Sequence, residues 1–155
     1  MSTINSAAGG FFARLDPDGS ISALLLRLSV AGAIFANGNT KLFGWITGGG
    51  VEQSAAWFEQ LGLQPAVALT ILFGSIEFFG GLLIALGLFT RPALMVVAAY
   101  FLFTLIFFFP NGYFWLTAGP STNAGRWTVV WGLAVFAALI RGPGRFSLDT
   151  KLFGK

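Results

Sequence analysis

The 155-residue chain has no cysteine and no histidine, and only 10% of its residues are charged. The lack of cysteine excludes disulfides, iron–sulfur ligation and thiol catalysis, and the lack of histidine excludes imidazole ligands and Ser/His or Cys/His pairs. Met95, the only methionine after Met1, lies in an apolar run, which argues against axial haem ligation. We therefore expect no metal site and no covalently held cofactor. A quinone or a lipid remains a possible ligand.

Apolar residues dominate the chain. Hydrophobic residues make up 55% of it, including 18 Phe and 5 Trp, and the mean hydropathy is +0.78. These values lie outside the soluble range and predict an integral membrane protein. The nine Lys and Arg residues are scattered at the ends of apolar segments, as topology charges are, so we expect no nucleic-acid partner. Residues 1–12 do not have the pattern of a cleaved signal peptide.

Four apolar segments predict four membrane-spanning helices, at about residues 22–43, 65–88, 91–109 and 125–140. At 1.5 Å per residue the first three reach ~28 to 36 Å and the fourth ~24 Å. Helices are favoured over strands because hydrocarbon requires each backbone group to be paired, and no alternating pattern occurs. We predict an all-α, single-domain protein over residues 1–155, folded as a four-transmembrane-helix bundle.

The basic residues are distributed unequally about this bundle. An even number of crossings places both termini on one side, and that side carries seven basic residues against two on the other. The two sets are Arg14, Arg27, Arg91, Arg141, Arg145, Lys151 and Lys155 against Lys41 and Arg126. The positive-inside rule then predicts cytoplasmic termini in a bacterial cytoplasmic (inner) membrane. The basic tail would contact anionic lipid or dock a soluble subunit.

The opposite side is rich in aromatic residues. Residues 51–61 place apolar and polar side chains on opposite helical faces, which predicts a short amphipathic helix in the interface between the first two spans. Six aromatic residues gather on this side: Trp45, Trp57, Tyr113, Trp115, Trp127 and Trp131. They form either an interfacial aromatic belt or an outer-leaflet site for a partner subunit, a lipid, a quinone or a pigment.

Glu77 is the most informative residue, because it lies near the middle of the second apolar segment. A carboxylate at that depth costs between ~2.5 and ~17 kcal/mol, depending on how the cost is measured. Glu77 lies in a stripe of small residues that includes Gly74 and Gly81, so we expect it to face another helix.

The first helix supplies two cations that could form an ion pair with this carboxylate. Counted from the cytoplasmic ends, Arg27 lies ~7 Å deep and Glu77 ~16 Å deep, whereas Lys41 lies ~13 Å beyond Glu77. We therefore predict a direct Arg27–Glu77 pair, with Lys41 contributing through Asn37 or a water. The pair either fixes helix register or handles protons for a quinone. The polar run at 37–41 either binds a carbonyl or an anion, or is an ordinary helix end in the headgroups.

Several of these features occur together in one known family. They are Arg27, Gly38, Lys41-Leu42-Phe43-Gly44, Glu77 with Gly80-Gly81, the turn at 87–92 and the ending at 142–149. In the order and spacing of these features, the chain resembles the DoxX family. The resemblance implies a four-helix bundle that serves as the small subunit of thiosulfate:quinone oxidoreductase or accompanies other membrane redox complexes. It marks Arg27, Lys41 and Glu77 as functional candidates and Arg91 and Asp149 as structural. Many relatives have histidine where this chain has Asn37, so a role that needs an imidazole there does not carry over.

We therefore expect a membrane subunit of a larger, quinone-linked or electron-transfer complex, without a redox centre of its own and not catalytic alone. Its partners would be membrane lipids and other subunits. A second hypothesis is a purely structural accessory at the edge of a respiratory or photosynthetic assembly. A third is a small transporter, which four spans without a visible repeat do not favour.

Overall fold

The computed structural model describes residues 16–46, 48–108 and 123–154. For residues 108 and 123–127 it describes the backbone only. This part of the chain forms six helices and no strand: α2 (Ser20–Leu42), α3 (Val51–Gln60), α4 (Ala66–Leu86), α5 (Thr90–Phe108), α6 (Asn123–Arg141) and α7 (Leu148–Phe153). Three of them, α2, α4 and α5, are long and apolar enough to cross a membrane, and α6 contains a shorter apolar stretch, Thr128–Arg141. The prediction of an all-helical membrane protein is confirmed.

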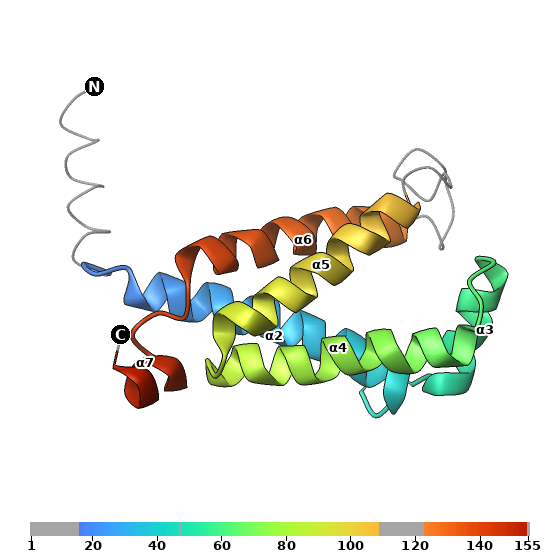
Figure 1. Ribbon diagram of the computed structural model, residues 1–155, viewed down its shortest axis with the longest axis horizontal. Coiled ribbons are helices and arrows are strands. Elements are labelled where there is room, and N and C mark those ends of the chain that lie inside the picture. The colour runs from blue at the N-terminus through green and yellow to red at the C-terminus, as the bar shows by residue number, and fades with distance from the viewer. Residues whose placement is uncertain (1–15, 47, 109–122, 155) are drawn as a thin grey trace, which may run out of the picture.

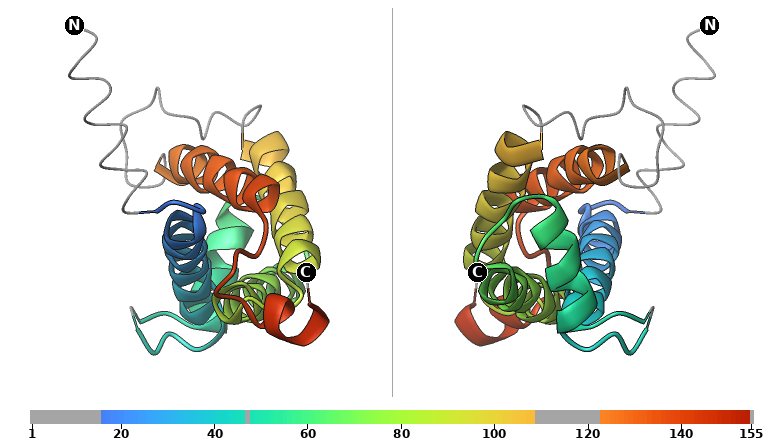
Figure 2. Two further views of the ribbon diagram at one scale, coloured as in Figure 1. Left: turned by 90° about the vertical axis from the view of Figure 1, so that its left-hand side faces the viewer. Right: turned by 90° about the vertical axis from the view of Figure 1, so that its right-hand side faces the viewer.

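The four long helices surround a common axis (Figures 1 and 2). Helices α2 and α4 lie side by side, and α5 and α6 form the other pair. Helix α3 closes one end of the bundle, and the segment from α6 to α7 crosses the other end (Figure 2). We call these the α3 end and the α7 end, and the adjoining parts of the bundle the α3 half and the α7 half.

Glycine allows α2 and α4 to pack closely. A Cβ atom at Gly38 would lie 2.3 Å from the backbone nitrogen of Phe78, and one at Gly81 would lie 2.7 Å from that of Phe35. Both distances are too short for any side chain, so the two backbones meet where only hydrogen fits. The predicted stripe of small residues around Glu77 is buried at this contact.

The α7 half has a solid apolar core. Seven of its side chains are no more than 1% exposed: Val30, Ala31, Ile34, Ile84, Leu94, Val97 and Val135. They come from all four long helices and form one cluster. Core packing of this density leaves little room for water or ligand.

The α7 end is closed by polar contacts to the backbone. Arg27 is 3% exposed and donates hydrogen bonds to the carbonyl oxygens of Pro143 at 2.5 Å and Phe146 at 2.6 Å. Asp149 accepts from the backbone nitrogens of Phe89 at 2.7 Å and Thr90 at 2.8 Å, which caps the start of α5. Burial alone would raise the pKa of Asp149, but these hydrogen bonds and the charge of Arg27 hold its pKa below the usual value.

The α3 end is held by aromatic contacts. Phe58 of α3 packs against Phe73 of α4, and both are buried in a cluster with Ala55 and Ala66. The polar residues Glu52 and Glu59 stand on the exposed face of the helix, as do Gln53 and Gln60. The predicted amphipathic character of this short helix is confirmed.

Candidate functional site

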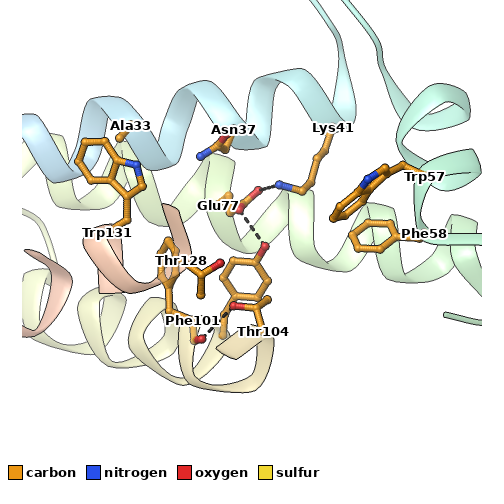
Figure 3. Close-up of a pocket in the computed structure, with 11 residues that line it drawn as sticks. Ala33, Asn37, Lys41, Trp57, Phe58, Glu77, Phe101, Thr104, Thr128 and Trp131 are labelled. Atoms are coloured by element: carbon orange, nitrogen blue, oxygen red, sulfur yellow. Dashed lines mark hydrogen bonds and ion pairs between the residues drawn. The ribbon is translucent and has the colours of Figure 1, made fainter. Parts of the chain in front are cut away.

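The Glu77 carboxylate is paired on both oxygens. Oε2 lies 2.5 Å from the Lys41 ammonium nitrogen, and Oε1 accepts a hydrogen bond of 2.9 Å from the Tyr100 hydroxyl. The Glu77 side chain is 4% exposed and that of Lys41 is 18% exposed. Helices α2, α4 and α5 thus each supply one member of a polar triad, Lys41–Glu77–Tyr100, in the α3 half (Figure 3).

The predicted pair between Arg27 and Glu77 is wrong, because Arg27 is bound to the carbonyls at the α7 end. The prediction assumed that the start of the first apolar segment and the end of the second lie at equal depth. In the structure Gly87, at the end of α4, lies against the Arg27 guanidinium, so the first turns of α2 extend past α4. This shift brings Gly38 level with Glu77, and Lys41 follows one turn later.

The triad lies on the wall of a cavity of about 510 Å³. Side chains from five helices line it: Ala33, Asn37 and Lys41 of α2, Trp57 and Phe58 of α3, Glu77 of α4, Tyr100, Phe101 and Thr104 of α5, and Thr128 and Trp131 of α6. Figure 3 shows Trp57 and Phe58 on one side of the triad and Trp131 on the other. Five of the eleven lining side chains are therefore aromatic, and the charged groups of Lys41 and Glu77 lie together between them.

The predicted polar run at 37–41 divides into two roles. Asn37 and Lys41 line the cavity. Asn39 is 1% exposed, and its side-chain oxygen accepts from the backbone nitrogen of Ile46, while the Thr40 hydroxyl donates to the carbonyl of Ala36. These two residues fix the end of α2. Asn37 is exposed to the cavity, and across the described parts of the chain its side chain makes no hydrogen bond.

The predicted aromatic cluster also divides. Trp57 and Trp131 line the cavity, but Trp45 is 73% exposed and stacks on Phe43 with ring centroids 4.2 Å apart, away from the cavity. Trp45 therefore does not line the cavity with Trp57 and Trp131, and its place in an outer aromatic cluster stays a prediction. Tyr113 and Trp115, and the side chain of Trp127, lie outside the described residues.

Besides Ala33, whose methyl group gives no signal, sequence reasoning missed five of the lining residues: Phe58, Tyr100, Phe101, Thr104 and Thr128. Tyr100 carried a usable signal, because a phenol inside an apolar span needs a hydrogen-bond partner. The other four lacked one, since Phe is common in this chain and an isolated Thr can bond its own helix, as Thr104 does with Phe101.

The cavity combines a cation, a carboxylate and a carboxamide with apolar aromatic walls. Lys41 can donate two further hydrogen bonds and Asn37 offers both donor and acceptor atoms, so together they suit a carbonyl oxygen on a flat ligand. Within residues 16–46, 48–108 and 123–154, no three acidic side chains come together as metal ligands would. The arrangement is suited to hydrogen bonding and proton transfer at the edge of an apolar ring.

The comparisons with known proteins agree with this architecture. The DoxX family matches residues 22–110, more than half of the chain. The chain is also similar to the uncharacterized membrane protein Rv3486 of Mycobacterium tuberculosis, with 31% identity over 162 positions that cover 98% of this chain and 94% of the relative. No solved structure matches the chain. On the extent of these two matches, the chain belongs to the DoxX family.

Proposed function

We propose that this protein is the membrane subunit of a quinone-linked electron-transfer complex, and that it binds the quinone ring in the cavity beside Lys41, Glu77 and Tyr100. The observation that carries the proposal is a buried, fully paired carboxylate on the wall of an aromatic cavity in a membrane protein. An ion pair in this position is costly. Contact with a ligand that takes up and releases protons would account for it.

The size and chemistry of the cavity support a quinone ring. Ligand cavities usually measure about 300 to 1,000 Å³ and hold a few polar groups in an apolar lining, and this one has about 510 Å³. Trp57 and Trp131 offer faces on which the ring can stack. A ring carbonyl would accept hydrogen bonds from Lys41 and Asn37, and the isoprenoid tail would extend into lipid.

The chain's residues would serve the proton side of the reaction. Reduction of a quinone to a quinol takes up two electrons and two protons. The electrons would come from a redox centre in a partner subunit, since this chain has neither cysteine nor histidine to hold a metal centre. The protons would reach the ring oxygens through Lys41 and Glu77, with Tyr100 holding the carboxylate in place.

Quenching of tryptophan fluorescence tests the binding of quinone. The purified chain in nanodiscs is titrated with a short-chain ubiquinone and, separately, with a naphthoquinone. Saturable quenching is expected, because Trp57 and Trp131 line the cavity. Lys41→Met should weaken binding about tenfold or more, since a charge-assisted hydrogen bond contributes ~1.5–3 kcal/mol.

Two matched variants control this experiment. Trp45→Phe removes a tryptophan outside the cavity, so the saturable quenching should persist. Lys151→Met removes an exposed lysine of α7 and should leave the affinity unchanged. Quenching that rises linearly without saturation, or that is equally strong in Lys41→Met, would contradict the proposal.

A purely structural accessory role is favoured by a different observation. The Lys41–Glu77 pair lies directly beside the close contact of Gly38 with α4, where it fixes the register of two helices. In that case Glu77→Gln would alter the amount of assembled complex but not the electron-transfer rate per complex. Loss of rate in a fully assembled complex would favour the quinone-binding role.

For the membrane topology we propose four crossings, with α6 as the fourth and both termini in the cytoplasm of a bacterium. Helix α6 has 19 residues, or ~28 Å at 1.5 Å per residue, close to the ~30 Å of hydrocarbon in a bilayer. The α7 end would then face the cytoplasm. Arg91, Arg145 and Lys151 lie exposed toward that end, which supports this orientation.

Single-cysteine labelling tests the orientation without background, since the chain has no cysteine. Gln53→Cys on α3 should react with a membrane-impermeant maleimide on intact spheroplasts, and Lys151→Cys on α7 should react only after lysis. Both residues are exposed, so access is limited by the membrane alone. Labelling of both variants on intact spheroplasts would overturn the topology.

A further inference from the structure

A second cavity adjoins the first at the α3 end. Its volume is about 470 Å³, and it lies between the end of α2, residues 48–49 and α3. Five of its nine lining residues have polar side chains: Asn37, Thr40, Lys41, Gln53 and Ser54. Two of its nine lining residues are aromatic, against five of eleven in the main cavity. A polar space of this size holds water readily.

The two cavities share one wall. Asn37, Lys41, Trp57 and Phe58 line both of them. The Lys41 side chain is 18% exposed, and the Glu77 side chain bound to it is 4% exposed. Exposure thus falls along the pair, with the ammonium group on the wetter side and the carboxylate on the drier side.

The glycine run before α3 forms the rim of the second cavity. Gly48 and Gly49 are exposed and line it. A Cβ atom at Gly49 would lie 3.2 Å from the carbonyl oxygen of Thr40 and 3.4 Å from the side-chain oxygen of Gln53. The backbone nitrogen of Gly50 donates to the same Thr40 carbonyl at 2.8 Å, which holds the rim against α2. The absence of side chains keeps the rim open.

The opposite direction is closed. Toward the α7 end the core consists of apolar side chains such as Ile34, Ile84 and Val135, each no more than 1% exposed. The groups that face Glu77 and can titrate are Lys41 from α2 and Tyr100 from α5. Helices α3 and α6 contribute Trp57, Phe58, Thr128 and Trp131 to the cavity, and none of these titrates near neutral pH.

We infer that the second cavity is an aqueous vestibule through which the Lys41–Glu77 pair exchanges protons and water with the α3 side of the membrane only. This inference extends the proposed function and rests on it, because the bound quinone is the reason why protons would need to move. The route itself depends only on the shared wall, the polar lining and the closed α7 half. Protons taken up by a quinone that is reduced in the main cavity would then enter from the α3 side.

Cysteine accessibility tests the vestibule independently of any quinone. Asn37→Cys and Thr40→Cys place a thiol on the vestibule wall in a chain that has no other cysteine. The probe is a methanethiosulfonate that carries a trimethylammonium group, which reacts with thiolates in water and does not cross membranes. In sealed vesicles of each orientation, both variants should react from the α3 side and not from the α7 side. Gln53→Cys and Lys151→Cys report which side is outside.

Four variants control for depth and for blockage. Gly32→Cys places a thiol on α2 at an exposed position where lipid, and not water, would surround it, so it should not react. Ala31→Cys places a thiol in the packed core and should not react either. Ser54→Trp, combined with Asn37→Cys, should slow the reaction about tenfold by filling the vestibule. Ala56→Trp is the matched control, because Ala56 is exposed on α3 and does not line the vestibule.

The outcomes separate this inference from the quinone proposal. Reaction from the α3 side without saturable quinone quenching would support the vestibule and overturn the quinone site. No reaction of either Asn37→Cys or Thr40→Cys from the α3 side, or an equal rate from both sides, would overturn the vestibule while leaving the quinone site to its own test. A misfolded variant is recognised by its elution profile in detergent, and the vestibule is then judged on the other variant.

Discussion

The two halves of the bundle use a cation from the same helix in different ways. In the α7 half Arg27 binds two backbone carbonyls at the end of a packed apolar core. In the α3 half Lys41 binds a carboxylate on the wall of a cavity. A carbonyl does not titrate at any physiological pH, whereas a carboxylate can take up a proton. The α7 half is therefore held as a fixed clamp, whereas the α3 half places an ion pair on the wall of a cavity.

The choice of cation fits each role. The guanidinium of Arg27 is a rigid fork with several donors, which suits two carbonyl oxygens at fixed positions. The ammonium of Lys41 is a single charge on a flexible stem, and it can change partners without movement of the helix. The difference teaches that the presence of a cation in a membrane segment does not reveal its role until its partner is known.

The largest effect is expected where the α3 half depends on helix contact. Gly38→Ala should destabilise the protein by about 3 kcal/mol, because the new Cβ meets backbone atoms that cannot move aside. Gly32→Ala on the same helix is the matched control, since nothing lies within 4 Å of a Cβ there. Unfolding by SDS in mixed micelles measures both. Equal stability of the two variants would show that α2 and α4 do not approach as closely as described.

A somewhat smaller effect is expected from the clamp of the α7 half. Arg27→Met should cost about 2 kcal/mol of unfolding free energy, because it leaves two carbonyls without their charged donor. Quinone quenching should be unchanged, since Arg27 does not line the cavity. Arg145→Met is the control: its exposed side chain should contribute no more than about 0.5 kcal/mol. Loss of quinone binding in Arg27→Met would contradict the assignment of quinone binding to the α3 half.

The helices were largely predictable from the sequence. The predicted spans at 22–43 and 65–88 differ by one or two residues at each end from α2 and α4, because Asp, Pro and Gly mark the boundaries. The relative depth of the helices was not predictable, because it depends on contacts between distant segments. The clamp between Arg27 and residues 143–146 sets that depth, and nothing in the local sequence of α2 reveals it.

The site was predictable only in part. Glu77, Lys41 and Asn37 could be identified because polar side chains inside apolar segments are costly and rare. Tyr100 and Phe58 could not be placed beside them, because their position depends on how α5 and α3 fold against α4. Trp45 was grouped with the cavity residues by its side of the membrane, but the turn after α2 directs it onto Phe43.

The smallest effect is expected from acid at the α7 end. The folded-state pKa of Asp149 lies below its usual value, so its contribution to stability is present above about pH 4, the unfolded pKa, and disappears as pH falls through the folded pKa. Asp149→Asn should cost about 0.5 to 1 kcal/mol at neutral pH, as loss of a helix cap does. The difference from the wild type should narrow as pH falls below about 4. A constant difference from neutral to acid pH would contradict the assigned role.

The most direct test of the account is a double-mutant cycle on the buried pair, measured as the free energy of unfolding in mixed micelles. Lys41→Met and Glu77→Leu should each destabilise the protein, because each leaves a buried charge alone, and the double variant should recover much of the loss. The predicted coupling is about 2 kcal/mol between Lys41 and Glu77 and about zero between Arg27 and Glu77. Additive losses for Lys41 and Glu77, or a strong coupling of Glu77 to Arg27, would contradict the account.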